Sequence, residues 1–227
     1  MDSGTRTLAI ACGALAREIV ALKRLNGWET LDIECLPPEL HNYPDKIPDA
    51  VASAIASARA RYSKIFVAYA DCGTGGLLDA VLVKEGVERL PGAHCYEFFA
   101  TSAIFAAMHD AEPGTFYLTD FLVRHFERLV VEGLGLSQHP ELTEQYFRNY
   151  RRIVYLAQTK NDELLAEAKS IATRFGFEFV YRLTEYGDLG ATLERVVHVP
   201  VSAVRRLPGL PSGLLKNQPK ESATWVR

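Results

Sequence analysis

Short, mostly apolar runs alternate with segments of helical periodicity from the start of the chain. Residues 7–12 and 64–70 form two such runs, and the second, KIFVAYA, is continuous and partly β-branched, as buried parallel strands tend to be. Between them, residues 13–25 carry apolar side chains every three or four positions until Gly27 ends the periodicity. This alternation predicts parallel strands joined by crossover helices.

The same pattern continues to about residue 197. It predicts further strands at 29–36, 93–98, 115–118, 153–157 and 177–183, and helices at 48–62, after Gly76, after Thr119, at 162–175 and at 189–197. We therefore expect an α/β fold with an open, mostly parallel sheet and crossover helices on both faces. Residues 1–199 are expected to form a single α/β domain, with two sub-lobes at 1–113 and 114–199 as the alternative. Residues 200–227, which contain prolines and glycines, are interpreted as a surface tail or docking arm.

Composition narrows the class of protein. The chain has 227 residues, of which 48% are hydrophobic, so it can bury a core without disulfides. Its net charge of -3 argues against a nucleic-acid partner, because such proteins concentrate Lys and Arg. The first residues lack the pattern of a secretory signal, and no apolar run reaches membrane-spanning length, so we expect a cytoplasmic protein without a membrane partner.

Three of the four cysteines lie where a predicted strand ends or close to it. These are Cys12, Cys72 and Cys95, whereas Cys35 alternates like an ordinary strand residue and is interpreted as structural. Carboxyl ends of parallel strands face a common crevice, so the three thiols are expected to meet there. In a reducing cytosol such cysteines are more often catalytic or metal-binding than disulfide-bonded. The sequence therefore predicts a metal site at the carboxyl ends of the strands.

Other interpretations of these cysteines stay open. A free cysteine is often just a small buried hydrophobe, and the spacing matches neither the local pairs of structural zinc modules nor ferredoxin clusters. If a metal is bound, its fourth position is left to His41, to a substrate or to water. His94 is a weaker candidate because neighbours on a strand, as His94 and Cys95 would be, point to opposite faces.

A glycine-rich turn follows the strand that delivers Cys72. Gly73, Thr74, Gly75 and Gly76 have the composition of a loop that binds a cofactor or phosphate through backbone amides at a helix start. The turn lacks the Walker lysine and the dinucleotide-binding spacing. We therefore interpret it as a close backbone approach to the metal or its ligand, with nucleotide binding as the alternative.

Polar side chains near the strand ends are candidates for catalysis. Tyr69, Asp71, Glu97 and Thr119 are placed there, where they can move protons or orient the ligands of the site. Each is equally suited to a helix cap or a turn. Asp120 is the clearest example of such a cap.

Several ordered phrases resemble the uncharacterised bacterial and archaeal domain-of-unknown-function family sixteen thirty-eight. They are ACGxLxxEI, LPPELHNYPDKI, YxDCGTGGLLD, HCYEFF and GTFYLTDF, spread over about residues 7–193. The resemblance implies that the family cysteines correspond to Cys12, Cys72 and Cys95, and that the histidine of the LHN phrase is His41. Asp120 and Phe121 replace an expected proline-glycine turn, which leaves the role of that loop open.

The resemblance also implies a functional setting. Family members occur beside corrinoid-dependent methyltransferases for methylated amines and betaines, which suggests one-carbon metabolism and a corrinoid or methyltransferase protein as partner. The expected cofactor is a metal centre held by cysteine thiolates, either zinc or a four-iron four-sulfur cluster. Zinc can activate a small-molecule thiol for methyl transfer, whereas a cluster with three thiolates leaves one iron open to substrate.

We thus expect a metal-dependent transferase or lyase. The alternative is a non-catalytic accessory protein that binds a corrinoid protein or a small ligand. The chain has no DxHxxG-like corrinoid motif of its own. The sequence leaves a homo-oligomer open.

Overall fold

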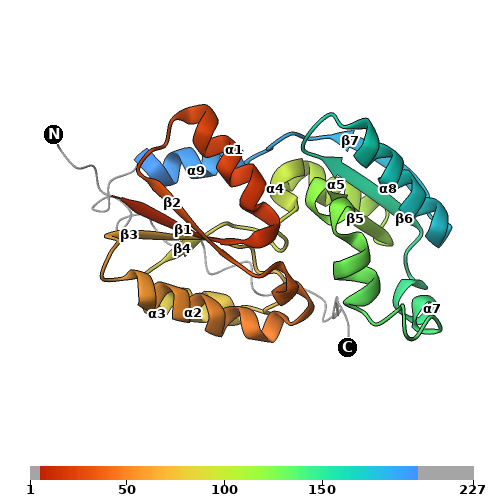
Figure 1. Cartoon of the computed structure of the whole chain (residues 1–227), viewed down its shortest axis with the longest axis horizontal. Helices are drawn as coiled ribbons and strands as arrows, with labels where there is room; N and C mark the ends of the chain where they lie inside the picture. The colour runs from red at the N-terminus through yellow and green to blue at the C-terminus, as the bar shows by residue number, and fades with distance from the viewer. Residues whose placement is uncertain (1–5, 199–227) are drawn as a thin grey trace.

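The computed structural model describes residues 6–198, which form an α/β fold with two parallel sheets (Figure 1). The predicted fold class and the parallel strands are confirmed. The expectation of a single sheet was wrong, because the strands within residues 6–198 divide into a four-stranded and a three-stranded sheet. The predicted tail at 200–227 lies outside the described residues.

The first sheet has the strand order β2-β1-β3-β4. Its strands are β1 (Thr7–Cys12), β2 (Leu31–Leu36), β3 (Lys64–Ala68) and the very short β4 (Glu88–Arg89). Register pairs Cys12 with Leu36 on one side of β1, and Ala11 with Ala68 on the other. Every residue of β1 is buried, as expected for a central parallel strand covered on both faces.

Helices cover both faces of this sheet. In Figure 1, α1 (Ala16–Asn26) and α9 (Leu189–His198) lie on one face, and α2 (Ile47–Ala58) and α3 (Leu77–Glu85) lie on the other. Gly27 and Gly86 end α1 and α3 in the left-handed conformation, which glycine adopts without strain. We call the part of the molecule built around this sheet the first half, and the part built around the other sheet the second half. Three short 3-10 helices complete the first half: η1 (Gly13–Leu15), η2 (Pro38–Asn42) and η3 (Pro44–Lys46).

The second sheet has the sequential order β5-β6-β7. Its strands are β5 (Thr115–Thr119), β6 (Arg152–Ala157) and β7 (Glu178–Leu183). Helix α4 (Glu97–Ala100) lies between the two halves. The helices of this half are α5 (Ser102–Ala111), α6 (Asp120–Arg124), the π-helix η4 (Glu127–Glu132), α7 (Leu142–Phe147) and α8 (Asp162–Phe175). Val123 of α6 and Ile171 of α8 share one core with β5 and β6, while Met108 of α5 packs in a separate cluster with Tyr117 and Val154.

The last described helix returns from the second sheet to the first. Leu189, Leu193 and Val196 of α9 belong to the core that contains β1, and α9 lies beside α1 (Figure 1). Where the chain crosses back, the amide of Asp188 donates a 2.8 Å hydrogen bond to the carbonyl of Phe98, so the two connections between the sheets are joined. Helix α5 packs on the second sheet, and α9 on the first.

The segment around Cys95 is not a strand, so the prediction for residues 93–98 was wrong. It is a turn followed by α4, and the strand of this region is the earlier β4. Gly92, with a φ of 95°, turns the chain away from the sheet. Phe98 packs in the core of the first half and Ala100 in a cluster of the second, which explains why this run is apolar without being part of a sheet.

Candidate functional site

The three sequence-predicted cysteines lie where the strand order of the first sheet reverses. The chain runs from β1 outward to β2 and then returns to place β3 on the other side of β1. In open parallel sheets, ligands bind at the carboxyl ends of the strands beside such a switch point. Cys12 is the last residue of β1, and Cys72 follows β3 by a few residues, so both lie at this edge.

The thiols and one imidazole are close together and buried. The Sγ atoms of Cys72 and Cys95 lie 3.1 Å apart, and the Sγ atom of Cys12 lies 3.8 Å from Nδ1 of His41. Cys95 also accepts a 3.5 Å hydrogen bond from the amide of Ala70, directly after β3. The exposed fraction of each of the three cysteines is 4% or less. The structure therefore brings these four side chains, from β1, η2 and the loops after β3 and β4, into one cluster, which we call the thiol group.

Backbone contacts hold the loops that carry these side chains. The amide of Cys72 donates a 2.8 Å hydrogen bond to the carbonyl of Ala93, so the loops after β3 and β4 run together. Cys72 itself has a φ of 50°, a conformation that is costly for a residue with a side chain. On the other side, a Cβ on Gly13 would lie 2.9 Å from the carbonyl oxygen of Leu36, so only glycine lets η2 and His41 approach Cys12 this closely.

The charges in this group are coupled. Hydrogen bonding with Cys95 lowers the pKa of both Cys12 and Cys72, against the effect of burial, and His41 lowers both further. The same contacts raise the pKa of Cys95. Burial alone would lower the pKa of His41, but the Cys72 and Cys12 thiolates outweigh it and raise that pKa. These shifts favour Cys12 and Cys72 as thiolates and Cys95 as a thiol that donates hydrogen bonds to them. They favour His41 as an imidazolium.

Tyr69 extends this group with an unused hydroxyl. The side chain is fully buried, and its hydroxyl oxygen has no hydrogen-bond partner among the described residues. Burial, followed by the nearby Cys12 and Cys95 thiols, raises the pKa of this phenol. The raised pKa keeps the hydroxyl protonated, so it is a hydrogen-bond donor beside the thiols. A buried polar group without a partner is unfavourable by about 1–3 kcal/mol.

The glycine-rich turn binds a carboxylate of the chain itself. Asp71 accepts hydrogen bonds from the Thr74 hydroxyl at 2.7 Å, from the Gly76 amide at 2.9 Å and from the Gly75 amide at 3.2 Å. Burial would raise the pKa of Asp71, but these donors outweigh it and lower that pKa. Gly73, with a φ of 85°, completes the turn. In this structure the amides predicted to approach a cofactor are instead engaged by Asp71.

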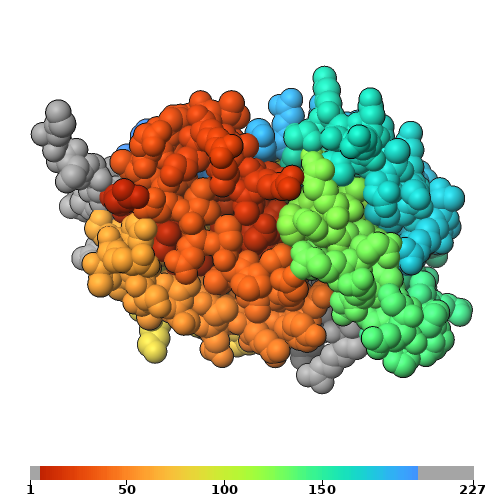
Figure 2. All heavy atoms as spheres, in the orientation of Figure 1, coloured from red at the N-terminus to blue at the C-terminus, as the bar shows by residue number. Residues whose placement is uncertain are grey.

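A small cavity adjoins the thiol group between the two halves of the molecule. Its volume is about 100 Å³. Figure 2 shows the halves in contact where the segment that contains His41 (orange) meets the segment that follows β5 (green). Here the side chain of Asn42 donates to the carbonyl of Leu129, and Arg128 pairs with Glu39. The lining residues come from both halves: Ala14, Leu15, Pro38, His41, Asn42, Cys95, Tyr96, Phe99, Thr119, Phe121, Leu122, Leu129 and Val130.

A family model described as "Protein of unknown function (DUF1638)" matches residues 35–193. The chain belongs to this family. No curated protein and no solved structure matches it. The family resemblance based on the ordered motifs is thereby confirmed. His41, Cys72 and Cys95 fall inside the matched segment of this DUF1638 protein, and Cys12 precedes it.

The remaining predicted residues of the DUF1638 chain lie around the thiol group. Thr119 borders the cavity, and its hydroxyl accepts a 3.2 Å hydrogen bond from the amide of Leu122, as an N-cap. A carboxylate oxygen of Glu97 accepts a 3.0 Å hydrogen bond from the amide of Ala93 and so closes the turn before Cys95. Cys35 is exposed and lies outside the group. His94 stacks on Tyr96 with ring centroids 5.1 Å apart.

Sequence reasoning missed Glu18 of α1, which is buried. Its Oε2 atom has no hydrogen-bond partner within residues 6–198. Burial and the nearby Asp120 raise the pKa of this carboxyl group, although Arg17 and Arg124 oppose them. A glutamate in the first turn of a helix is ordinarily exposed, so the local sequence does not indicate that Glu18 is buried. Its burial depends on the packing of the second half against the first.

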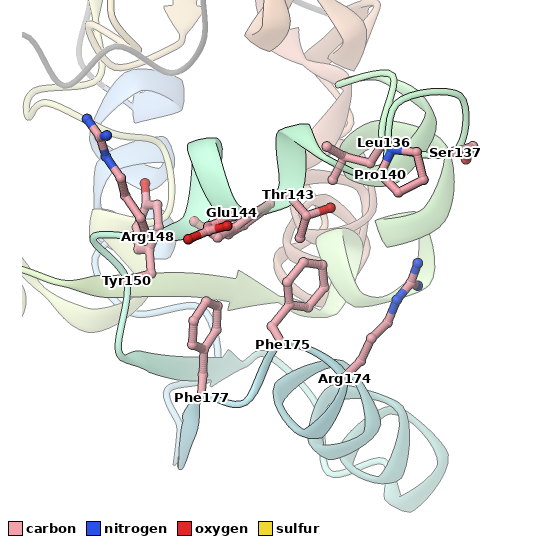
Figure 3. Close-up of a pocket in the computed structure, with 11 residues that line it drawn as sticks. Leu136, Ser137, Pro140, Thr143, Glu144, Arg148, Tyr150, Arg174, Phe175 and Phe177 are labelled. Atoms are coloured by element: carbon pink, nitrogen blue, oxygen red, sulfur yellow. The ribbon is translucent and has the colours of Figure 1, made fainter.

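A larger groove lies elsewhere in the second half (Figure 3). Its volume is about 610 Å³, and none of the sequence-predicted site residues lines it. Phe175 and Phe177 stack on each other in its wall, with centroids 5.8 Å apart, and Arg174 at its rim pairs with Glu127. These residues thus already have partners within this half of the molecule.

As the side chains stand, no three His, Cys, Asp or Glu residues among 6–198 are arranged to hold a metal ion. A tetrahedral zinc ion with bonds of about 2.3 Å to sulfur separates two sulfur ligands by about 3.8 Å. The Cys72–Cys95 separation of 3.1 Å is shorter. In the same part of the chain, no helix is long and apolar enough to cross a lipid bilayer.

Proposed function

We propose that this DUF1638 protein binds a single soft metal ion through the thiolates of Cys12, Cys72 and Cys95, and that it uses this ion to bind and activate a thiol substrate. The observation that carries the proposal is the contact of Cys72 with Cys95 at 3.1 Å, beside the Cys12–His41 contact at 3.8 Å. Thiolate and imidazole ligands together favour zinc among the common metal ions. His41 completes a closed site unless a substrate takes its place.

The chemistry of the residues fits such an ion. Two thiolates against one imidazolium leave a net negative charge in a buried site, which is unfavourable without a further cation. The lowered pKa of Cys12 and that of Cys72 agree with the thiolate form of two ligands, whereas the raised pKa of Cys95 means that binding an ion would have to release the proton of this third thiol. The buried Tyr69 hydroxyl lies beside these thiolates, and it can donate a hydrogen bond to a sulfur or oxygen atom held there.

The separations favour one ion over a four-iron four-sulfur cluster. Each cysteine ligand of such a cluster binds a different iron, which holds the sulfur atoms well apart. Here two sulfur atoms are in contact, so a change of about 0.7 Å brings them to zinc-ligand distance. A cluster would require the loops after β1, β3 and β4 to separate much further.

The chain's own residues would divide the work as follows. The three thiolates would hold the ion, and the ion would supply a Lewis acid that favours the thiolate form of a substrate thiol. Tyr69 would donate a hydrogen bond to the substrate sulfur atom and so orient it. The apolar cavity excludes water from the reacting sulfur. This assignment makes the protein a metal-dependent transferase of the kind that methyl transfer in one-carbon metabolism requires.

A thiol–disulfide redox function is the second candidate, and the 3.1 Å Cys72–Cys95 contact favours it. A disulfide forms from two thiols by loss of two protons and two electrons, with a sulfur–sulfur bond of about 2.05 Å. A disulfide substrate would accept the electrons by exchange, cleaving its own sulfur–sulfur bond and leaving as two thiols.

Metal analysis of the anaerobically purified protein separates these candidates. We expect about one zinc per chain, no absorbance near 400 nm, and free thiols at all cysteines after denaturation. Cys12→Ser, Cys72→Ser and Cys95→Ser should each lose most of the zinc, whereas Cys35→Ser, at the exposed cysteine, should keep it. Circular dichroism checks that each variant is folded.

Other outcomes overturn the proposal. Iron and sulfide at cluster stoichiometry would favour the iron–sulfur alternative. A metal-free protein with a Cys72–Cys95 disulfide after mild oxidation would favour the redox function. Zinc retained in all three variants would place the ion elsewhere.

A further inference from the structure

The wall of the cavity beside the thiol group is mostly apolar. On the side of the first half, Leu15 and Phe99 contribute carbon surface, and on the side of the second half Phe121, Leu122 and Val130 do so. No Asp, Glu, Lys or Arg lines it among the described residues. A ligand whose sulfur atom lies beside His41 and Cys95 would therefore place an amino or carboxylate group at its other end against carbon surface, where that group loses its hydration without gaining a partner.

The polar groups of the wall are mostly in use. The amide nitrogen of Asn42 donates to the carbonyl of Leu129, and the hydroxyl of Thr119 accepts from the amide of Leu122. His41 and Cys95, by contrast, face the cavity from within the thiol group itself. The sulfur and imidazole groups of the cavity wall thus lie together at one end, where a sulfur atom would bind.

The volume limits the size of the occupant. A cavity of about 150 Å³ holds a benzene molecule. The volume of about 100 Å³ found here therefore suits a smaller group, such as an alkyl chain of about three carbons. A whole nucleotide or peptide is too large for this volume.

We propose that the substrate is a small, uncharged alkyl thiol, whose alkyl chain occupies this cavity and whose sulfur atom points toward Cys95 and His41. The inference deepens the proposed function, on which it rests for the role of the sulfur atom. The selection against charge, however, comes from the cavity wall alone and can be measured with or without metal.

Binding of three thiols of similar size tests the inference. Titration calorimetry, on protein as purified and on zinc-loaded protein, would compare propane-1-thiol with 2-aminoethanethiol and 3-mercaptopropanoate. We expect propane-1-thiol to bind at least about tenfold more tightly than either charged thiol, because with the sulfur atom beside Cys95 and His41 the ammonium or carboxylate at the other end would lie against carbon surface. Equal or tighter binding of a charged thiol would overturn the inference.

Variants that fill the cavity locate the binding site. Leu122→Phe and Ala14→Leu narrow it from opposite walls, and each should weaken propane-1-thiol binding by about tenfold or more. Leu25→Phe, at a residue of α1 that is 74% exposed, is the matched control and should bind normally. If every folded cavity variant binds propane-1-thiol like the control, the cavity is not the site.

The two proposals fail in different ways. Absence of bound zinc, with propane-1-thiol still preferred and still blocked by Leu122→Phe, would refute the metal and keep the substrate class. Zinc at stoichiometry without preference for the uncharged thiol would keep the metal and refute the substrate class.

Discussion

The hydroxyl of Tyr155 donates a 2.7 Å hydrogen bond to the carboxylate of Asp120, and both residues are buried. The same carboxylate accepts hydrogen bonds from the backbone amide of Gln158 at 3.0 Å and from the Thr159 hydroxyl at 2.5 Å. Asp120 thus joins the carboxyl end of β5 to that of β6, which is the edge of the second sheet that faces the thiol group.

Tyr155→Phe removes one of these three donors. Burial, together with Asp120, raises the pKa of Tyr155, which keeps the hydroxyl protonated and donating throughout the neutral range. We expect the free energy of unfolding to fall by about 1–3 kcal/mol, because a buried carboxylate loses a donor that water does not replace. Urea unfolding measures the change. Tyr181→Phe, at the neighbouring residue of β7 that is 39% exposed, is the control and should change the stability little; an equal loss there would contradict the explanation.

Glu18→Gln should stabilise the protein near neutral pH. Because folding raises the pKa of Glu18, the folded state holds its proton more tightly than the unfolded state. The stabilisation that comes from this tighter proton binding is therefore complete below about pH 4.5, the ordinary pKa of a glutamate side chain. It is lost as the pH rises through the higher pKa that Glu18 has in the folded state.

The glutamine variant removes this dependence. Its advantage over the parent should be small at pH 4 and reach about 1 kcal/mol or more at pH 8, measured by urea unfolding at both pH values. Glu29→Gln, at an exposed position nearby, should show no such trend. A Glu18→Gln advantage that is equal at pH 4 and pH 8 would argue for a packing effect instead.

Gly13→Ala should displace the loop that carries His41. A Cβ there would meet the Leu36 carbonyl oxygen and Cδ of Pro38, both at 2.9 Å, and a backbone atom cannot move aside as a flexible side chain does. We expect a loss of about 1–3 kcal/mol in the free energy of unfolding. Gly190→Ala of α9 meets only Leu22 at 3.4 Å, and this control should be neutral or stabilising by about 0.5–1 kcal/mol. Thermal unfolding of both variants gives the comparison.

Thr119→Ala tests whether this residue does more than cap α6. Loss of the cap should cost about 1 kcal/mol of stability, and Thr119→Ser, which keeps the hydroxyl, should restore most of it. If capping is the whole role, the affinity for propane-1-thiol should change little in either folded variant. A large loss of affinity in Thr119→Ala with stability unchanged would indicate direct contact with the ligand.

Much of the fold followed from local patterns. The run at 64–70 and the helix at 162–175 were predicted closely, since β-branched runs and helical spacing are properties of the segment itself. The division into two sheets was not predictable in this way. A strand such as β5 has the same local pattern whether it extends the first sheet or begins a second, so only long-range packing distinguishes them.

The sequence also predicted part of the candidate site, namely that the cysteines after the strands of the first sheet lie together. Cys12 and Cys72 could be placed because strand ends of one parallel sheet converge. Cys95 was placed near them for the wrong reason, since it lies in a turn and not on a strand. The burial of Glu18 left no mark in the local pattern, because it depends on contact between the two halves.

The return of α9 to the first sheet affects how the chain folds during its synthesis. Domains usually fold from the N-terminus as they emerge from the ribosome. Here Leu189, Leu193 and Val196 complete the core around β1, the first strand to be made. The β1 core therefore stays incomplete until nearly 200 residues have been translated, and a chain truncated after β7 would expose the surface that α9 covers.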